Sequence, residues 1–561
     1  MAVVGRSFGH LFRAFLAQFF TSETVTSDVQ MRQAIIGVLA FVLTPCLMLL
    51  PRGFGQFQQL SYRARFNVPP AVIVRLNAVR GLAFQDLTEA VVSILIAYSM
   101  IVVGLVAVFA WDALTFDRRD AMVLGPLPIT PATIVLAKLA ALCALLLGAS
   151  LGVNLLNSLL FAAGTADRIG FSAFAANLVS CLIVTTAAAT LVFSTVVIVR
   201  GVVVGIGVAR LAAVTGSLFQ FAFVVVLLGL ILASFASPHR QARLAVPETT
   251  LPPVTWFIAW FEVIRRSPRG AWLDVIAMSR PAQWLVPLSV LGAAATSVLA
   301  FRHQMRRALT PLAAPGPLGH ARVSRFIARL LCGPDRISRA VSDFVLTTVV
   351  RNRAQQAPIA MNAAIGFAFV TFSFARQRGD STSTWLAAPL VLAFWVAIGL
   401  RAAFFVPSEL PAAWTFEANA SAAFGSFARG VRAAIAGFIA PPAAAIGFAV
   451  GGPRYALLVA LLAIGLADFV VLTIDFVPFT RAYRPGHAKL KQRWPVYLLS
   501  SLVVATVLPQ APLWSAAIGL AILESTLYVA RRGWSIEPQY EEADDDHATV
   551  LNLTGALGRA T

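Results

Sequence analysis

The sequence has few charged residues. Of its 561 residues only 12% are Asp, Glu, Lys or Arg, whereas 58% are hydrophobic. Soluble domains carry roughly 25% charged residues, so this chain lacks the charge needed to cover an ordinary water-exposed surface. The deficit excludes a soluble globular protein and indicates that lipid surrounds most of the chain. Because the apolar runs are unbroken and do not alternate with polar residues, they predict helices and exclude a β-barrel.

Cysteine and histidine are also scarce. The four cysteines form no CxxC pair, and three of them, Cys46, Cys143 and Cys181, lie in apolar runs, whereas Cys332 does not. The six histidines lie outside the apolar runs and form no HExxH pair. These patterns predict small packing residues, with no disulfide framework and no metal site. We also expect no cleavable signal peptide, because Arg13 interrupts the only early apolar stretch.

Nucleotide-binding and catalytic motifs are missing as well. The sequence contains no GxxxxGK[ST] phosphate-binding loop, no GxGxxG after a strand pattern and no GxSxG nucleophile elbow. It therefore predicts no catalytic residue, no cofactor and no enzyme activity in this chain. Any ATP hydrolysis that drives it would belong to a separate protein.

Long apolar runs dominate what the sequence does contain. Runs near 20 residues predict about six transmembrane helices in each half of the chain. The runs of the first half are Gln33–Leu50, Ala90–Trp111, Leu139–Ala163, Phe171–Val199, Leu211–Phe235 and Trp284–Phe301. Those of the second half are Ile359–Phe374, Trp385–Val406, Val431–Val450, Tyr455–Val477, Val496–Leu508 and Leu513–Ala530. The expected fold is an all-α polytopic membrane protein of about twelve transmembrane helices, arranged as two six-helix modules with interfacial amphipathic helices.

The domain organisation follows from where the polar segments lie. Residues 1–301 and 358–534 are the two predicted modules, and a basic linker, 302–357, joins them. The tail 535–561 contains an acidic run and is expected to be solvated and partly disordered. Three prolines between Thr310 and Leu318 predict a hinge within the linker.

The net charge of +19 bears on topology and partners. In a soluble protein it would suggest nucleic acid, but here cationic loops fix orientation and meet anionic lipid headgroups. We therefore expect membrane lipids and no nucleic acid as partners. The linker 302–357 and the basic loop Thr480–Pro495 are predicted to face the cytoplasm, which puts both termini there, as in an inner (cytoplasmic) membrane protein. The loops 51–89 and 236–283 are also basic, yet the same count places them outside.

Three shorter segments have the character of helices at the membrane surface. Before the first span, Phe8, Leu11, Phe12 and Phe15 recur at helical spacing. Ile337–Val350 has a similar pattern, and in both cases the helix either lies in the interface or packs on its own protein. A third segment, 251–264, is too short for a full crossing and is predicted to be interfacial or re-entrant.

Two acidic residues lie within predicted spans, Asp468 and Glu524. An acid at the middle of a transmembrane helix costs roughly 2.5 to 3.5 kcal/mol, so each needs a reason to be there. One interpretation makes them a proton or cation relay. The other, which we favour because no second cation-binding cluster accompanies them, makes them structural acids paired with an arginine or a hydroxyl of a neighbouring helix.

The segment after the second span is the most informative. It joins the charged residues Asp117 and Asp120 to a short apolar piece, two prolines and a new helix that Thr130 can cap and Pro131 can begin. We call Asp117–Pro131 the elbow. Lys138 follows it and is expected to reach toward the lipid headgroups. Such a segment offers a neighbouring soluble protein a rigid projection.

This elbow resembles the cytoplasmic loop of type-2 ABC exporter permeases. The matching residues are Asp120, Leu124, Leu127, Pro128, Ile129, Thr130 and Lys138. The order of an amphipathic N-terminal helix, two spans, the elbow and a third span matches as well, over the first half of the chain. The second half is only weakly similar, with a degenerate counterpart at Val406–Trp414. The resemblance implies a permease half that docks on a separate cytoplasmic ATPase through its N-terminal helix and elbow.

The expected function is therefore the membrane-spanning permease subunit of an ABC-type exporter that uses ATP hydrolysed by a partner. The alternative is a proton- or ion-coupled secondary transporter, which would need Asp468 or Glu524 in a cavity near the middle of the membrane. A membrane protein with no transport role also fits the composition. The substrate and the direction of transport are not readable from these residues.

Overall fold

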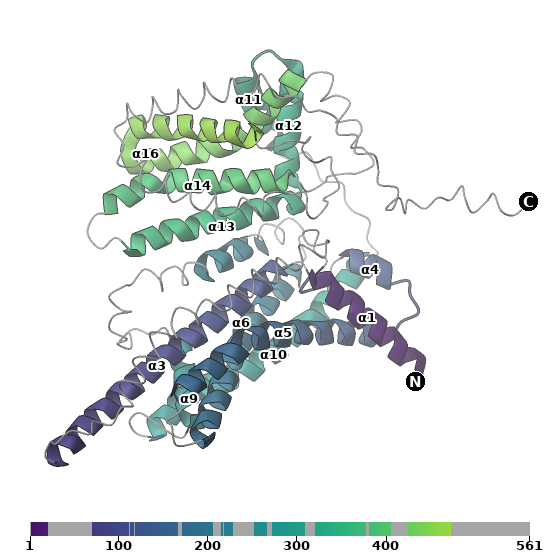
Figure 1. Ribbon diagram of the computed structural model, residues 1–561. Coiled ribbons are helices and arrows are strands. Elements are labelled where there is room, and N and C mark those ends of the chain that lie inside the picture. Colours follow the sequence, from purple (N-terminus) through teal and green to yellow (C-terminus); the bar gives the residue numbers. More distant parts are fainter. Residues whose placement is uncertain are drawn as a thin grey trace, which may run out of the picture. The chain divides into compact units, whose positions relative to one another are not determined.

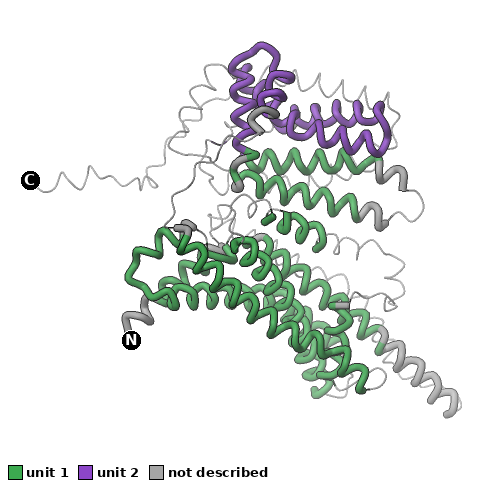
Figure 2. Tube along the Cα trace, turned by 180° about the vertical axis from the view of Figure 1, so that it is seen from behind, with its two compact units in different colours: residues 1–319, 349–403, 483–510 green, residues 320–348, 404–482, 511–561 purple. Residues whose placement is uncertain are grey.

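The computed structural model is helical throughout the secondary structure that it describes (Figure 1). It describes residues 2–20, 70–111, 113–116, 118–165, 171–205, 215–216, 218–227, 252–265, 272–308, 320–376, 381–404, 424–472 and 479. Contacts divide the chain into two compact units, shown in Figure 2. Unit 1 comprises 1–319, 349–403 and 483–510, and unit 2 comprises 320–348, 404–482 and 511–561. This division differs from the modules 1–301 and 358–534, which stay a prediction.

Six helices of the described residues are long and apolar enough to cross a membrane. These candidate spans are Leu87–Val108, Pro131–Thr165, Phe171–Gly205, Trp272–Arg306, Leu386–Ala403 and Gly425–Asp468. By length and composition they make the chain a multi-pass membrane protein. The predicted spans Gln33–Leu50, Val496–Leu508 and Leu513–Ala530 lie outside the described residues, so the number twelve stays a prediction.

Unit 1 contains most of the described helices. They are α1 (Ala2–Phe20), α3 (Pro70–Phe109), α4 (Arg118–Leu124), α5 (Pro131–Thr165), α6 (Phe171–Gly205), α9 (Pro252–Arg265), α10 (Trp272–Ala308), α13 (Arg353–Arg376) and α14 (Ser381–Ala403). A short apolar helix, Leu218–Leu227, lies between α6 and α9 in the sequence. Helices α13 and α14 pack closely, because Gly366 leaves room for the Trp395 side chain.

Buried apolar residues show which way the long helices of unit 1 run. One cluster joins Ile134, near the start of α5, to Phe301, near the end of α10. Another joins Phe161, near the end of α5, to Cys181 of early α6 and Ala282 of early α10. Helices α6 and α10 therefore run toward the same end of the unit, and α5 runs away from it. We call the end with Ile134 and Phe301 the elbow end, since α4 lies there.

The predicted short helix before α10 lies at the opposite end of unit 1. Helix α9 has 14 residues, which span about 21 Å, less than the roughly 30 Å of a bilayer core. Its Phe257 and Phe261 are buried in the cluster that holds Phe161 and Cys181. Because α10 also begins at this end, α9 does not carry the chain across unit 1, as the sequence predicts.

Two predicted polar segments are largely helical in the structure. The predicted loop 51–89 is helical from Pro70 onward, where α3 begins. Helix α3 has 40 residues and extends about 60 Å, which is twice the thickness of a bilayer core. The linker 302–357 contains the end of α10, then α11 (His320–Cys332), α12 (Arg336–Arg351) and the start of α13. The first part of α3 and the whole of α11 combine helix-forming residues with charge, so apolar runs do not predict them. Helix α12 contains the segment Ile337–Val350, which the sequence predicts as a helix.

Unit 2 is built from α11, α12 and α16 (Phe424–Leu472). Helix α16 is two helices joined at a kink, where Gly452 adopts φ 76° and ψ −171°. The chain reverses there, since Nε of Arg432 lies 2.6 Å from a carboxylate oxygen of Asp468, although the two residues are 36 apart in the sequence. Gly447 lies against Val459 across the reversal. This hairpin corresponds to the predicted spans Val431–Val450 and Tyr455–Val477, and Gly452 takes the left-handed conformation that glycine adopts without strain.

Candidate functional site

The elbow is a short helix followed by a tight turn. Helix α4 ends at Leu124, and the backbone N–H of the next residue, Gly125, donates to the Ala121 carbonyl over 2.9 Å. A Cβ at Gly125 would lie 2.6 Å from that same carbonyl oxygen, so no larger residue fits there without a shift. The N–H of Leu127 then donates to the carbonyl of Leu124 over 3.2 Å. Pro126 and Pro128 have no N–H, which prevents the helix from continuing.

Helix α5 begins as the sequence predicts. The backbone N–H of Thr133 donates to the Thr130 side-chain oxygen over 3.4 Å, and the two threonine hydroxyls lie 2.7 Å apart. Pro131 occupies the first turn of α5. Thr130 thus caps the helix and Pro131 starts it, which confirms both expectations. The turn between α4 and α5 is therefore fixed by hydrogen bonds at both of its ends.

An aromatic cluster anchors the elbow to the rest of unit 1. The Phe116 ring, just before α4, lies edge-on to Phe15 of α1 at 5.8 Å between centroids and to Phe301 of α10 at 4.8 Å. Leu11 and Ile134 are buried in the same cluster, which we call the Phe116 cluster. Helix α1 therefore packs its apolar face on its own protein, the second of the two alternatives for this segment. His10 and Arg13 lie on its exposed side.

Lys138 lies inside this cluster. Its side chain is 1% exposed, and its ammonium is 4.8 Å from the Phe15 ring centroid and 5.8 Å from that of Phe116. The expectation that Lys138 reaches the lipid headgroups is therefore wrong, because α1 covers it. Burying an ammonium is costly, and cation–π contacts of this kind offset about 2 kcal/mol when they are desolvated.

The predicted docking residues separate into two groups. Leu124 and Ile129 are half-buried against the Phe116 cluster, whereas Leu127 is 45% exposed and Pro128 is exposed. Asp120 is half-buried. Asp117 lies outside the described residues. Leu124 and Ile129 therefore pack in part on their own protein, and their role in docking stays a prediction.

Two exposed residues of the elbow were missed by the sequence reasoning. Met122 is 51% exposed and Val123 is 62% exposed, on the side of α4 away from Ala121, which is buried. Helical spacing contains the signal, since residues three apart share a face and Ala121 pairs with Leu124 toward the cluster. Met122, Val123 and Leu127 form what we call the elbow patch.

The elbow patch lies at the basic end of α10. A Cβ on Gly125 would lie 3.7 Å from the Met305 sulfur, so the turn rests on the last part of α10. Arg302 and Arg306 are exposed on the same part of that helix. The elbow and the basic start of the predicted linker therefore share one end of unit 1.

The intramembrane acid Asp468 has an arginine partner. Arg432 donates two hydrogen bonds to its carboxylate, from Nε over 2.6 Å and from a terminal nitrogen over 2.7 Å. The Asp468 side chain is fully buried and that of Arg432 is 35% exposed. This is the bidentate geometry in which both charges are satisfied. The structural interpretation of Asp468 expects such a pair and stays a prediction, and Glu524 lies outside the described residues.

The described residues contain no group of three or more His, Cys, Asp or Glu side chains placed to hold a metal ion. One polar contact between α5 and α6 is the hydrogen bond that Asn177 donates to Thr165 over 2.9 Å. Neither a protein family, nor a curated protein, nor a solved structure matches the chain.

Proposed function

We propose that this chain is the membrane-spanning permease subunit of an ABC-type exporter, driven by ATP that a separate cytoplasmic subunit hydrolyses. In this proposal about twelve spans form two modules in the inner (cytoplasmic) membrane, with both termini in the cytoplasm. The ATPase docks on the elbow patch. The observation that carries the proposal is the exposure of Met122, Val123 and Leu127 on a turn that the protein holds rigid.

The place of the patch in the sequence supports a protein partner. Helix α4 lies after the apolar span Leu87–Val108 and before the one that begins at Pro131. Lipid tails therefore do not account for its exposed apolar side chains. Apolar residues gathered at an exposed position outside the membrane core mark a contact surface. Burial of each such side chain contributes roughly 1.5 to 3 kcal/mol to binding.

Charge supports the cytoplasmic side. Arg302 and Arg306 are exposed at the same end of unit 1 as the elbow. Basic residues beside a span end mark the cytoplasmic face. ATP is hydrolysed in the cytoplasm, so a docking surface for an ATPase must lie at this end.

The Phe116 cluster supplies a route from the docking surface into the membrane. It joins residues of α1, α5 and α10 around Phe116, directly before α4. Close-packed side chains transmit displacement because interiors have few voids. A displacement of the elbow therefore moves the start of α5 and the end of α10, which are both candidate spans.

The test is to replace Val123 and Leu127 with Glu together and to measure membrane abundance and co-purified ATPase. Both side chains are exposed, so abundance stays normal, while a carboxylate in a desolvated contact abolishes binding of the partner. Ile337→Glu is the control, because Ile337 is as exposed as Leu127 but belongs to α12 of unit 2. It keeps the ATPase.

Two outcomes would contradict the proposal. In one, no ATPase co-purifies with the unmodified protein under conditions that preserve membrane complexes. In the other, the Val123→Glu, Leu127→Glu variant retains the partner fully. Ile129 is left unchanged because it packs on the Phe116 cluster, so an acid there would perturb folding and confuse the two effects.

The ion-coupled alternative depends on Asp468 and Glu524. Asp468 is paired with Arg432 at 2.6 Å, and this close pair supports a structural role for the carboxylate. Asp468→Asn keeps a hydrogen-bonding side chain while it removes the charge. We expect transport to survive this change, and loss of transport together with loss of its pH dependence would favour the secondary transporter.

A further inference from the structure

Helix α11 in unit 2 has one face packed on its neighbours. Ser324 and Ala328 are buried on this face. The Ser324 hydroxyl donates to the Asp343 carboxylate of α12 over 2.5 Å. Gly437 of α16 leaves room for the Ile327 side chain, because a Cβ there would overlap it. The packed face therefore sets how α11 rests on the first half of the α16 hairpin.

The exposed side of α11 combines an apolar row with a basic row. Phe326 is 65% exposed and Leu330 is 71% exposed, and residues four apart lie one above the other on a helix. Arg325 and Arg329 are exposed at the same spacing, one position earlier in each turn. The apolar row and the basic row thus run side by side along the helix. Leu331, at 42% exposure, extends the apolar surface.

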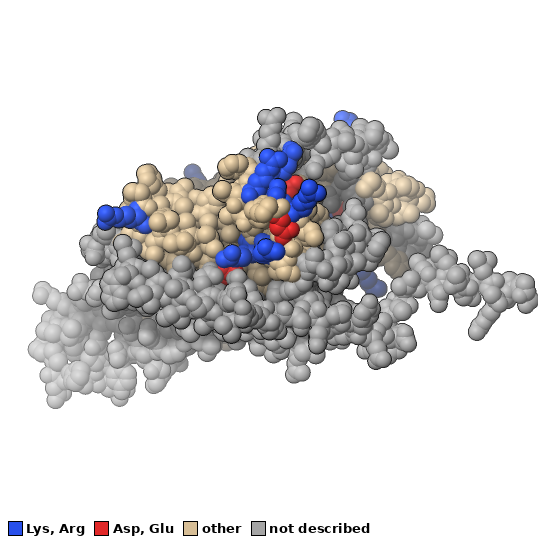
Figure 3. Space-filling model, turned by 90° about the horizontal axis from the view of Figure 1, so that it is seen from above, with Lys and Arg blue, Asp and Glu red and all other residues tan. Residues whose placement is uncertain are grey.

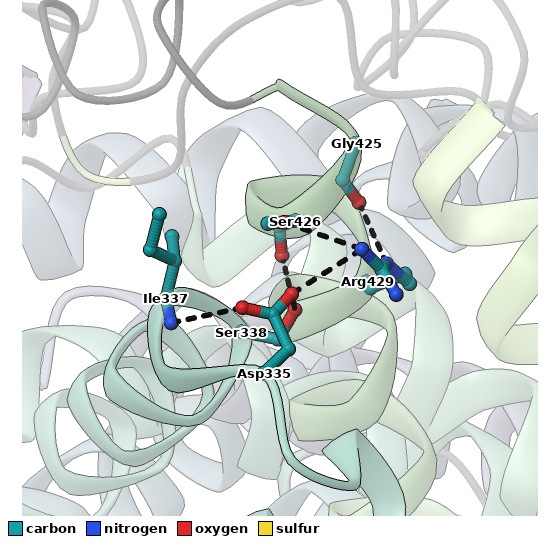
Figure 4. Close-up of polar contacts among 6 residues, drawn as sticks. All are labelled: Asp335, Ile337, Ser338, Gly425, Ser426 and Arg429. Carbon is teal, nitrogen blue, oxygen red and sulfur yellow. Dashed lines mark hydrogen bonds and ion pairs between the residues drawn. The ribbon is translucent and has the colours of Figure 1, made fainter.

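A polar corner at the start of α12 joins Asp335 to Arg429 of α16 (Figure 4). The Asp335 carboxylate accepts a hydrogen bond from the backbone N–H of Ile337 over 3.1 Å, which caps α12, and pairs with Arg429 of α16 at 3.3 Å. Hydrogen bonds, first that of Ser338, lower the pKa of Asp335 to about 2. This carboxylate is therefore ionised at neutral pH and holds the Arg429 side chain at the corner.

The arginines around the corner outnumber the acids. Arg329, Arg336 and Arg429 are all exposed, whereas Asp335 and Asp343 are half-buried and have the partners given above. Figure 3 shows basic side chains grouped around a few acidic ones on the face where α11 and α12 lie in Figure 1. Such a surface is complementary to an anionic one.

Helix α11 packs near the arginine-bearing start of the α16 hairpin. Arg429 and Arg432 lie near the start of the apolar stretch Gly425–Asp468, and Gly437, where α11 packs, is five residues past Arg432. At 1.5 Å per residue this is about 8 Å along the helix axis. The exposed row of α11 therefore lies toward the polar end of this stretch, which is where a helix at a membrane surface is expected.

We propose that α11 is an interfacial helix that binds anionic phospholipid. Phe326 and Leu330 enter the acyl boundary of the membrane, and Arg329, Arg336 and Arg429 bind the phosphate groups of anionic headgroups. The inference goes beyond the export function and does not depend on it. It commits to lipid as the occupant because the apolar row runs beside exposed arginines and because α11 packs on α16, which belongs to an apolar stretch long enough to cross a membrane.

The test places a fluorophore on the apolar row of the full chain. In a cysteine-free background, Leu330→Cys carries an environment-sensitive dye, and the protein is reconstituted into nanodiscs with or without phosphatidylglycerol. A doxyl group near the headgroup quenches a dye inserted in the interface, and aqueous iodide quenches a dye in water. We expect doxyl quenching to dominate, and to increase when phosphatidylglycerol is present.

The arginines are tested in the same discs. Arg329→Gln with Arg336→Gln reduces the increase in doxyl quenching that phosphatidylglycerol causes. The reduction is roughly fivefold for each arginine, because each contributes about that factor near an anionic surface. Arg329→Lys with Arg336→Lys is the matched control, since it preserves charge and retains the dependence. If Leu330→Cys does not fold, Phe326→Cys places the dye on the same row.

Two results would overturn the inference. Dominant iodide quenching in both kinds of disc would place the row in water, as for a surface that binds a soluble protein. Unchanged dependence on phosphatidylglycerol in the glutamine variant would exclude the arginines as its cause. Failure of the ATPase to co-purify would leave both readouts untouched, so the two proposals stand or fall separately.

Discussion

The elbow in unit 1 and the corner of α11 and α12 in unit 2 both present exposed apolar side chains, but the two regions are held differently. The elbow rests on aromatic rings around a buried lysine, and its exposed patch contains no arginine or lysine. The corner is held by carboxylates, hydroxyls and arginines, and its apolar row runs beside a basic one. An uncharged patch on a rigid turn suits a protein partner, whereas an apolar row flanked by arginines suits an anionic membrane.

Loss of the aromatic anchor gives the largest expected effect. Phe116→Ala removes a buried ring that touches Phe15 and Phe301, and it lowers the free energy of unfolding by about 3–5 kcal/mol. Thermal unfolding in detergent measures it. Phe116→Leu, which removes the ring but keeps more of the apolar volume, costs less. A loss below about 1 kcal/mol for Phe116→Ala would mean that this ring does not hold the elbow.

Loss of the buried acid of the hairpin gives the next largest effect. Asp468→Ala leaves Arg432 without its carboxylate and destabilises the protein by about 3 kcal/mol, since Arg432 retains some access to water. The double variant Asp468→Ala, Arg432→Ala is less destabilised, because the unpaired charge causes most of the loss. Equal melting temperatures for the single and double variants would show that the unpaired arginine does not cause the loss.

The buried lysine of the elbow gives a smaller effect. Lys138→Met keeps the length of the side chain and removes the charge, so the loss of about 2 kcal/mol of cation–π attraction is largely offset by relief of the buried ammonium. We expect an unfolding free energy close to that of the unmodified protein, measured in the same detergent. A large loss would instead show that the ammonium itself organises the Phe116 cluster.

Acid pH gives the smallest expected effect, and it acts on the corner of α11 and α12 through Asp335. The hydrogen bonds of Asp335, that of Ser338 first, lower its pKa from 3.8 to about 2. Its contribution to stability is therefore complete above about pH 4 and is lost as the pH falls toward 2. The protection of the amides at the start of α12 against hydrogen exchange, relative to the intrinsic rate at each pH, decreases in this window. Asp335→Asn, which retains a capping side chain, removes the pH dependence, and unchanged protection in the unmodified protein would refute the assignment.

Much of the helical architecture is predictable because long apolar runs leave few alternatives. The α16 hairpin is readable from the Gly451-Gly452-Pro453 sequence between two such runs, and α9 from its length. Helix α11 was missed because arginines alternate with its apolar residues, which makes it look like a polar linker. The first part of α3, which includes Arg75 and Arg80, was missed for the same reason.

The elbow was predictable as a segment but not as a surface. Proline and threonine spacing fixed its turn and the start of α5, since these effects are local. The burial of Lys138 depends on α1, which is more than 100 residues away in the sequence and covers it with Phe15. The half-burial of Leu124 and Ile129 likewise depends on the Phe116 cluster, which includes Phe301 of distant α10.

Photo-crosslinking from one residue in each region tests the difference between them most directly. A benzophenone side chain replaces Leu127 in the elbow patch or Leu330 on α11, both of which are exposed. In intact cells we expect Leu127 to capture a protein that contains a phosphate-binding loop, and Leu330 to capture phospholipid. Capture of no protein at Leu127, or of the same protein at both positions, would contradict the assignment of the elbow as the ATPase docking surface.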